Sequence, residues 1–182
     1  MRRPPAALTC LLAVLATVGV QAAVPDYQVK AEFVERFTRF IDWPAPGPGE
    51  ADAGGETPFV LCQIGDSALG NHLQSMIARR RIKDRPGVLR HLQGPDEVDS
   101  CHLLVIGLSE RDRLWRILER TAHRPILTVG DGEGFAERGV LISFYQEPPY
   151  LRFAINARAA RASGLKFSAQ LLRLGRIVGG PP

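Results

Sequence analysis

The fold of this chain is decided by residues 101–107, CHLLVIG, where a cysteine and a histidine precede four consecutive aliphatic residues and a glycine. A short, continuous apolar run of this kind is typical of a strand buried on both faces of a parallel sheet. The pattern recurs in residues 59–65 (FVLCQIG) and 125–129 (PILTV). Together the three runs predict a largely parallel sheet.

Segments with helical periodicity lie between these strands, as a parallel sheet requires. Residues 67–81 place an apolar stripe on one helical face, made of Leu69, Leu73, Met76 and Ile77. Residues 87–92 (GVLRHL) predict a weaker strand. Ser109 is the predicted N-cap of the next helix, with Asp112 in the capping-box position.

The C-terminal third predicts a hairpin and two helices. Residues 140–146 (VLISFYQ) and 150–156 (YLRFAIN) are joined by Glu147-Pro148-Pro149, a spacing typical of a hairpin. Asn156 is expected to cap a helix that ends at Gly164, and Ser168 to cap a last helix that contains Ile177 and Val178. The predicted fold class is α/β: a largely parallel three-layer sheet with crossover helices, an antiparallel C-terminal hairpin and terminal helices.

Residues 1–22 have the features of a secretory signal peptide. Two arginines precede an apolar run over residues 6–20, and the small-residue pattern VQA ends at Ala22. This order predicts export across the inner membrane and cleavage near Ala22, leaving a periplasmic chain of residues 23–182; an uncleaved anchor is the alternative. Removal of the peptide leaves 21 basic and 19 acidic residues, a net charge of +2. We therefore expect no nucleic-acid partner, and we interpret the basic run at residues 79–85 as a solvated helix end.

Residues 23–182 are predicted to form a single domain. Apolar residues make up 45% of the whole chain, which is enough for a sizeable core. Residues 27–44 predict a helix that ends at Trp43-Pro44. Its apolar face is expected to comprise Val29, Phe33, Phe37, Phe40 and Ile41, and its polar face Lys30, Glu32, Glu35, Arg36 and Arg39. Residues 45–58, rich in proline, glycine and acids, predict a mobile surface loop.

One candidate for catalysis is the Gly65-Asp66-Ser67 turn after the first strand, which resembles the nucleophile turn of GDSL-type esterases. Such an enzyme needs a histidine base near its C-terminus, and no histidine follows His123. We therefore favour helix capping by Ser67 or Asp66, and expect no catalytic residue.

Metal or phosphate binding has equally weak support. The histidines His72, His91, His102 and His123 are isolated from one another, and adjacent Cys101 and His102 point to opposite faces of a strand. The glycine-rich residues 128–135 (TVGDGEGF) follow a strand, but the acids Asp131 and Glu133 would repel an anion. We expect no cofactor and interpret this segment as a tight turn.

Apolar surface on the terminal helices and the outward face of the hairpin are the predicted partner surfaces. The candidate partner-binding residues are Phe33, Phe37, Trp43, Tyr150, Arg152, Leu171 and Leu174.

In order, these segments resemble the YfiR family of small periplasmic proteins. The matching pieces are KAEFVERFTRFIDWP, FVLCQIGDSALG, CHLLVIG, PILTVGDGEGFAERGVLISF and LRFAINARAARASGLKFSAQLLRLGRIV. They cover nearly all of residues 23–182, and the last two carry most of the specificity.

The resemblance implies a periplasmic α/β protein, often a homodimer, without catalytic activity. It implies restraint of an inner-membrane diguanylate cyclase or another receptor through its periplasmic region, which limits cyclic-di-GMP and biofilm formation. An outer-membrane lipoprotein can sequester such a repressor. Relatives can carry a further cysteine pair downstream, but no cysteine follows Cys101 in this chain. The alternative is a periplasmic small-molecule-binding module using the strand ends near Gly65, Gly107 and Gly130, or less favourably the esterase.

Export also bears on the cysteines. Cys62 lies in the first strand and Cys101 at the entry to the third, which should be its neighbour in a right-handed α/β sheet. Adjacent strands approach closely enough for a bridge, and the periplasm oxidises thiols. The sequence therefore predicts a Cys62–Cys101 disulfide, with no role assigned to His102.

Overall fold

The computed structural model of the chain describes residues 27–44 and 57–180. The predicted signal peptide and most of the predicted loop at 45–58 lie outside the described residues, so both stay predictions. Among the described residues, no helix is both long and apolar enough to cross a membrane.

The main sheet of the described chain has the strand order β3-β2-β4-β5-β6-β7-β9. The strands are β2 (Phe59–Ile64), β3 (Gly87–Leu92), β4 (Leu103–Ile106), β5 (Leu127–Gly130), β6 (Ile142–Glu147), β7 (Tyr150–Asn156) and β9 (Arg176–Val178). Strands β2 to β6 run parallel, β7 is antiparallel to β6, and β9 is parallel to β7. The predicted parallel sheet and C-terminal hairpin are therefore confirmed.

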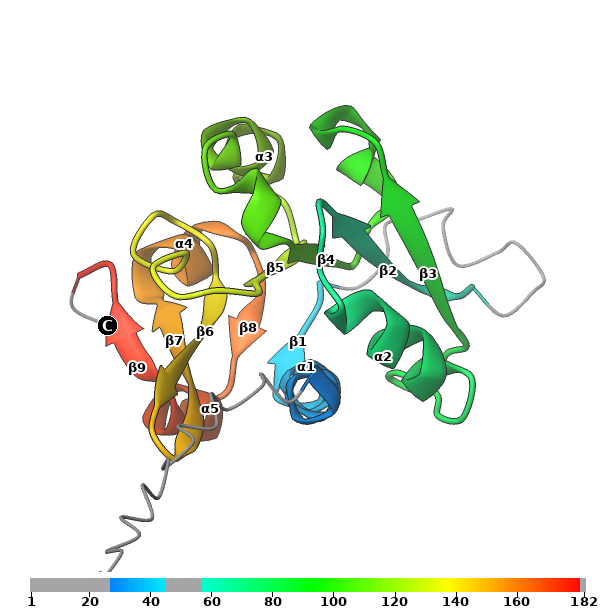
Figure 1. Ribbon diagram of the computed structural model, residues 1–182, viewed down its shortest axis with the longest axis horizontal. Coiled ribbons are helices and arrows are strands. Elements are labelled where there is room, and N and C mark those ends of the chain that lie inside the picture. Colours follow the sequence, from blue (N-terminus) through cyan, green and yellow to red (C-terminus); the bar gives the residue numbers. More distant parts are fainter. Residues whose placement is uncertain (1–26, 45–56, 181–182) are drawn as a thin grey trace, which may run out of the picture.

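Helices cover both faces of this sheet. They are α1 (Tyr27–Arg39), α2 (Leu69–Ile77), α3 (Leu114–Thr121), α4 (Ala157–Ala162) and α5 (Ala169–Leu174), with 3₁₀ turns at Pro95–Ser100 (η1) and Leu108–Glu110 (η2). Figure 1 shows α1, α2 and α5 on one side of the sheet, and α3 and α4 on the other. A short antiparallel pair, β1 (Ile41–Asp42) with β8 (Lys166–Phe167), ties the end of α1 to the segment before α5. The three-layer α/β prediction is confirmed.

The position of β4 between two helical layers explains why its sequence is so apolar. Leu103 and Val105 pack into the core beneath α1 and α2, whereas Leu104 and Ile106 pack into the core on the α3 side. All four side chains are completely buried. A strand with helices on both faces has no polar side, so the alternation seen in half-exposed strands is absent.

The predicted orientation of α1 is correct in part: Phe37 and Ile41 are buried, but the burial of two charged residues was not predicted. The buried side of the helix includes Lys30, Val34 and Glu35, whereas Val29 is 38% exposed. Glu35 accepts a hydrogen bond from the Arg39 Nε at 2.7 Å. Lys30 is paired with the buried Asp131, whose Oδ1 lies 2.6 Å from its Nζ. Paired charges can therefore occupy a face that the hydrophobic pattern alone leaves to solvent.

Two further local predictions are corrected. The last helix ends at Leu174, and Ile177 and Val178 belong instead to β9, because the chain turns at Gly175 to pair with β7. A Cβ on Gly175 would lie 2.7 Å from the Phe153 ring, so the turn packs directly on the sheet. Ser109 does not cap α3; its Oγ accepts a hydrogen bond from the Asp66 backbone N–H at 2.8 Å.

The predicted caps of the last two helices are confirmed. The Asn156 Oδ1 accepts from the Ala159 N–H at 2.8 Å, and the Ser168 Oγ accepts from the Leu171 N–H at 3.1 Å. Gly164, after α4, has φ +78°, the left-handed conformation expected of a residue that ends a helix.

Candidate functional site

The carboxyl end of the parallel sheet carries a buried polar network that links α1 to the turn after β5. The Lys30 Nζ lies 2.6 Å from the Asp131 Oδ1 and donates to the Asp131 carbonyl at 3.1 Å. The Ser67 hydroxyl donates to the second Asp131 carboxylate oxygen. Lys30 and Asp131 are 5% and 4% exposed. Both carboxylate oxygens are therefore occupied inside the protein.

Aromatic rings close this network on the α1 side. The Lys30 ammonium lies 4.8 Å from the centroid of Tyr27 and 5.6 Å from that of Phe144. Burial, and then the negative charge of Asp131, raise the pKa of the Tyr27 hydroxyl. The His72 ring stacks on Tyr27 with centroids 6.3 Å apart. The ammonium thus faces aromatic rings as well as the carboxylate, an arrangement that suits a buried cation.

This arrangement gives no support to an esterase. The Ser67 hydroxyl accepts from the N–H of Leu69, the first residue of α2, at 3.1 Å while it donates to Asp131. The N-cap position is Ala68, which makes no side-chain capping bond, so the predicted cap is not formed by Ser67 or Asp66. Among the described residues, which include all four histidines, no imidazole hydrogen-bonds to Ser67. A nucleophilic serine needs such a base.

The strand ends near Gly65, Gly107 and Gly130 are closely packed against neighbouring segments. A Cβ on Gly107 would lie 2.3 Å from the Asp66 carbonyl oxygen, and one on Gly130 would lie 2.4 Å from the Phe135 ring. These glycines let the loops and strand ends approach each other directly. The structure therefore favours the tight-turn interpretation of residues 128–135 over a ligand crevice.

The expected disulfide joins β2 to the segment that precedes β4. Cys62 and Cys101 are joined with their Cα atoms 5.8 Å apart, and both residues are buried. In the parallel register of β2 and β4, Cys62 lies opposite Leu104, so Cys101 reaches it from the segment that precedes β4.

His102 has a structural role that the sequence did not reveal. Its Nδ1 accepts from the Val60 N–H at 3.0 Å, its carbonyl accepts from the Trp43 Nε1 at 3.2 Å, and its ring stacks on Phe59. The Arg85 guanidinium lies 3.3 Å from its Nε2. Burial, and then the charge of Arg85, lower the pKa of the imidazole. A neutral His102 thus extends the β2–β4 pairing by one residue before the start of β4.

The basic run at residues 79–85 is largely occupied by internal bonds. Arg80 pairs with Glu32 at 2.7 Å, and Lys83 donates to the Ile41 carbonyl at 3.0 Å. Arg85 donates to the carbonyls of two residues before β2.

Within residues 27–44 and 57–180, no cluster of three histidine, cysteine or acidic side chains could hold a metal ion.

The candidate partner-binding residues divide into three groups. Phe37 and Leu171 are 1% and 2% exposed, so their assignment to a partner surface is wrong, because they fill the core under α1 and α5. Phe33 and Trp43 are half-buried and pack against that core. The exposed candidates are Tyr150 at 59%, Leu174 at 64%, and Arg152.

The exposed hairpin residues belong to a larger polar and aromatic surface. We call it the hairpin surface and define it as Tyr145, Glu147, Tyr150, Arg152 and Arg176. Cross-strand register places Glu147 opposite Tyr150 and Tyr145 opposite Arg152. The Arg152 guanidinium lies 5.2 Å from the Tyr150 ring, and that of Arg176 lies 4.4 Å from the Tyr145 ring.

The sequence predicted two of the five residues of this surface. Alternation along β7 identified Tyr150 and Arg152, but Tyr145 lies on the partner strand and Arg176 was predicted in a helix. Tyrosine and arginine side chains dominate the binding energy of many protein interfaces, so the hairpin surface is the candidate functional site.

Comparison with known families identifies the chain. Residues 27–176 match the model of a family described as YfiR/HmsC-like. No curated protein sequence matches the chain significantly. The matched residues include every helix and strand described above except the end of β9. The chain therefore belongs to the YfiR/HmsC-like family.

Proposed function

We propose that this protein is an exported regulatory binding protein that restrains an inner-membrane diguanylate cyclase, or a related signalling receptor, by binding its periplasmic region. The observation that carries the proposal is the family match over residues 27–176. The repressor would lower cyclic-di-GMP by binding the inactive state of the receptor more tightly than the active state.

The hairpin surface is the proposed contact with the receptor. Tyr150 is 59% exposed, and the Arg152 side chain is 50% exposed beside Glu147. An exposed tyrosine–arginine pair can bury its apolar area against a partner while the guanidinium pairs with an acidic group. Leu174, the last residue of α5, is 64% exposed but lies beside the face of β7 that carries Phe153, opposite to Arg152, so it is not part of this contact.

The proposal includes no catalytic activity. The Ser67 hydroxyl is engaged on both sides by Asp131 and the Leu69 N–H, which supports a structural role. Hydrolysis of a short-chain ester by the purified protein that is abolished in Ser67→Ala would contradict this part of the proposal.

A homodimer and capture by an outer-membrane lipoprotein are part of the same proposal. Both would compete with the receptor if they use the hairpin surface. Light scattering of the purified protein measures the first, and a competition assay with the lipoprotein's periplasmic domain measures the second. A dimer that is unchanged in Tyr150→Ala would assign dimerisation to another face.

The decisive experiment is a deletion and complementation series in the native host, with cyclic-di-GMP as the readout. Deletion should raise cyclic-di-GMP, and wild-type protein should restore it. The double variant Tyr150→Ala/Arg152→Glu should fail to restore it and should bind the receptor's periplasmic region at least about tenfold more weakly. Trp115→Ala is the matched control, since Trp115 is 61% exposed but lies on α3.

Two results would contradict the proposal. Unchanged cyclic-di-GMP in the deletion strain, with an intact receptor present, would reject the regulatory function. Full restoration by the double variant would reject the hairpin surface while leaving the function in place.

A further inference from the structure

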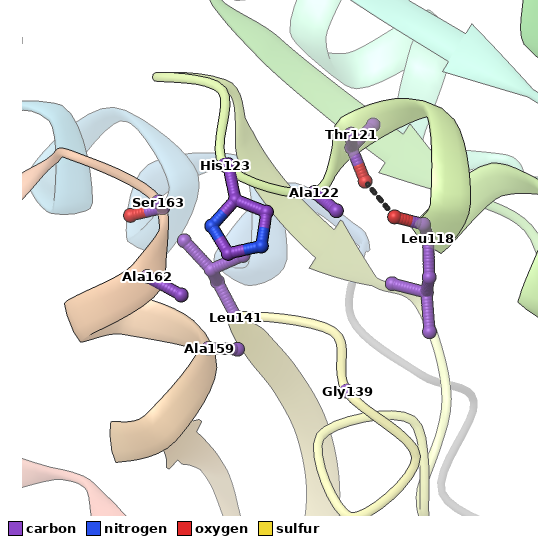
Figure 2. A pocket seen from close by; sticks show the side chains of 9 residues that line it. All are labelled: Leu118, Thr121, Ala122, His123, Gly139, Leu141, Ala159, Ala162 and Ser163. Carbon is purple, nitrogen blue, oxygen red and sulfur yellow. Dashed lines mark hydrogen bonds between the residues drawn. The ribbon is translucent and has the colours of Figure 1, made fainter.

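A cavity of about 210 Å³ lies between α3, α4 and the segment that leads into β6. Figure 2 shows α4 forming one wall, the end of α3 the other, and Leu141 the floor. It is separate from the hairpin surface, with which it shares no residue. It is a pocket that opens to the surface, because Ala122, His123 and Ala162 in its lining are exposed.

The cavity exists because its walls are made of small residues. Ala122 lies at the end of α3, and Ala159 and Ala162 lie on α4, whose sequence is ARAARA. Gly139 contributes the third side with φ +115°, and a Cβ there would be 3.1 Å from the Leu118 side chain. The surface of the cavity is accordingly almost entirely apolar.

Two of the three polar side chains in the lining are already satisfied. The Thr121 hydroxyl donates to the Ile117 carbonyl at 3.0 Å. The Ser163 hydroxyl donates to the Ala160 carbonyl at 2.8 Å and accepts from the Leu165 N–H at 3.2 Å. Neither hydroxyl hydrogen is free for a ligand.

The third polar side chain, His123, is exposed and lies at the mouth of the pocket. Its imidazole forms no hydrogen bond or ion pair with any residue that the structure describes, and Figure 2 shows the ring between Ala122 and Ala162, directed toward Leu141. His123 has φ +57°, a left-handed conformation that is uncommon for residues other than glycine. The lining thus combines apolar walls with one unoccupied hydrogen-bonding group.

The charge on the α4 wall is positive. Arg158 lies one turn before Ala162 on α4; it is exposed, lies outside the pocket lining, and forms no ion pair within the described residues. On the α3 side, Arg124 is already paired with Asp99. A bound anion could therefore draw on His123 and Arg158 without breaking an existing ion pair.

We propose that this cavity binds a small organic carboxylate with an apolar ring or branched chain. The apolar part would lie against Leu118, Leu141 and Ala159, and the carboxylate would face His123 and Arg158. The volume suits this class, because an engineered apolar cavity of about 150 Å³ takes benzene, which leaves room here for a carboxylate. Benzoate is the appropriate probe, with an expected Kd of about 1 mM for a ligand of so few atoms.

The test is a titration of the purified protein with benzoate, followed by saturation-transfer NMR. Wild-type protein should bind. Ala162→Leu fills the cavity and should weaken binding at least about tenfold, whereas Ala169→Leu makes the same change on an exposed position of α5 and should bind as wild type does. Thermal unfolding of each variant checks that the fold is retained.

A third variant tests the polar group. His123→Asn removes the imidazole but keeps a residue that tolerates positive φ. It should weaken benzoate binding at least about threefold and leave the binding of uncharged benzyl alcohol within about twofold.

Three outcomes would overturn the proposal: no benzoate binding at about 10 mM, equal binding to folded Ala162→Leu, or equal weakening of benzoate and benzyl alcohol by His123→Asn. If Ala162→Leu loses affinity for the receptor while wild type binds no benzoate, the cavity accepts a partner's side chain and the ligand proposal is wrong. The benzoate and benzyl alcohol readouts do not depend on the regulatory function.

Discussion

The buried network at the carboxyl end of the sheet and the hairpin surface contain the same three kinds of side chain, a cation, an acid and a tyrosine. In the buried network, the Lys30 ammonium lies 2.6 Å from Asp131 and 4.8 Å from the Tyr27 ring. The side chains of the ion pair are 6% and 2% exposed. This network joins residues about 100 positions apart and fixes α1 to the sheet.

On the hairpin surface, the corresponding cation, acid and tyrosine are exposed to solvent. Arg152 lies 3.5 Å from Glu147 and 5.2 Å from the Tyr150 ring, and the side chains of the ion pair are 50% and 61% exposed. Exposed ion pairs contribute little to stability, because water competes for both charges. Loss of one partner of a buried pair is costly, because the other charge stays desolvated. The comparison therefore assigns stability to the first group and leaves the second free for a partner.

The largest expected effect tests whether the hairpin surface is independent of the buried part of the sheet. Cys62→Ala with Cys101→Ala removes a bridge of sequence separation 39, which should lower the free energy of unfolding by about 4 kcal/mol in the chain-entropy model. Binding of the receptor's periplasmic region should change less than about twofold while the protein stays folded. Urea unfolding measures the first quantity, and a loss below about 1 kcal/mol would contradict it.

The second prediction compares the stability contributed by the buried and the exposed ion pair directly. Lys30→Met should lower the free energy of unfolding by about 3 kcal/mol, at the low end for a broken buried pair because Ser67 still donates to Asp131. Arg152→Met is the matched control on the hairpin surface and should change stability by less than about 0.5 kcal/mol. Urea unfolding of both variants is the measurement, and equal losses would show that burial does not separate the two ion pairs.

A double variant distinguishes a lost charge pair from lost packing. Lys30→Met/Asp131→Asn leaves no unpaired buried charge and should recover at least about 1 kcal/mol relative to Lys30→Met alone. No recovery would mean that the Lys30 stem, and not its charge, stabilises α1.

The sheet could be predicted from the sequence because its pattern is local. Residues 103–106 are apolar throughout, and burial on both faces leaves no other position for such a strand. Asn156 and Ser168 act on groups three residues away, so their capping roles were also predictable. Strand and cap signals of this kind need no information about distant segments.

The buried charges of α1 and the end of the chain could not be predicted in the same way. Lys30 is buried because Asp131, 101 residues later, is its partner, and no local pattern contains that contact. Residues 176–178 became a strand because β7 offers an edge beside them. Tyr145 and Arg176 meet only through this pairing, so the sequence revealed Tyr150 and Arg152 but missed the rest of the hairpin surface.

The smallest effect concerns pH and again separates buried from exposed groups. Because the pKa of His102 is lower in the folded protein than its ordinary value near 6.5, the unfolded chain binds more protons between the two values. Stability contributed by neutral His102 is therefore complete above about pH 6.5 and declines as the pH falls toward the folded pKa. Protonation would abolish acceptance of the Val60 N–H and place a second cation beside Arg85.

The measurement is the free energy of unfolding between about pH 7.5 and pH 5 in wild type, His102→Gln and Arg85→Met. His102→Gln should lose the contribution of this residue and flatten the slope. Arg85→Met should flatten it only in part, because burial is the larger cause of the lowered pKa and remains. An unchanged slope in His102→Gln would show that other groups govern the acid response. A stronger response in Arg85→Met than in His102→Gln would mean that Arg85 acts through its bonds to the carbonyls of Thr57 and Pro58 and not through the imidazole.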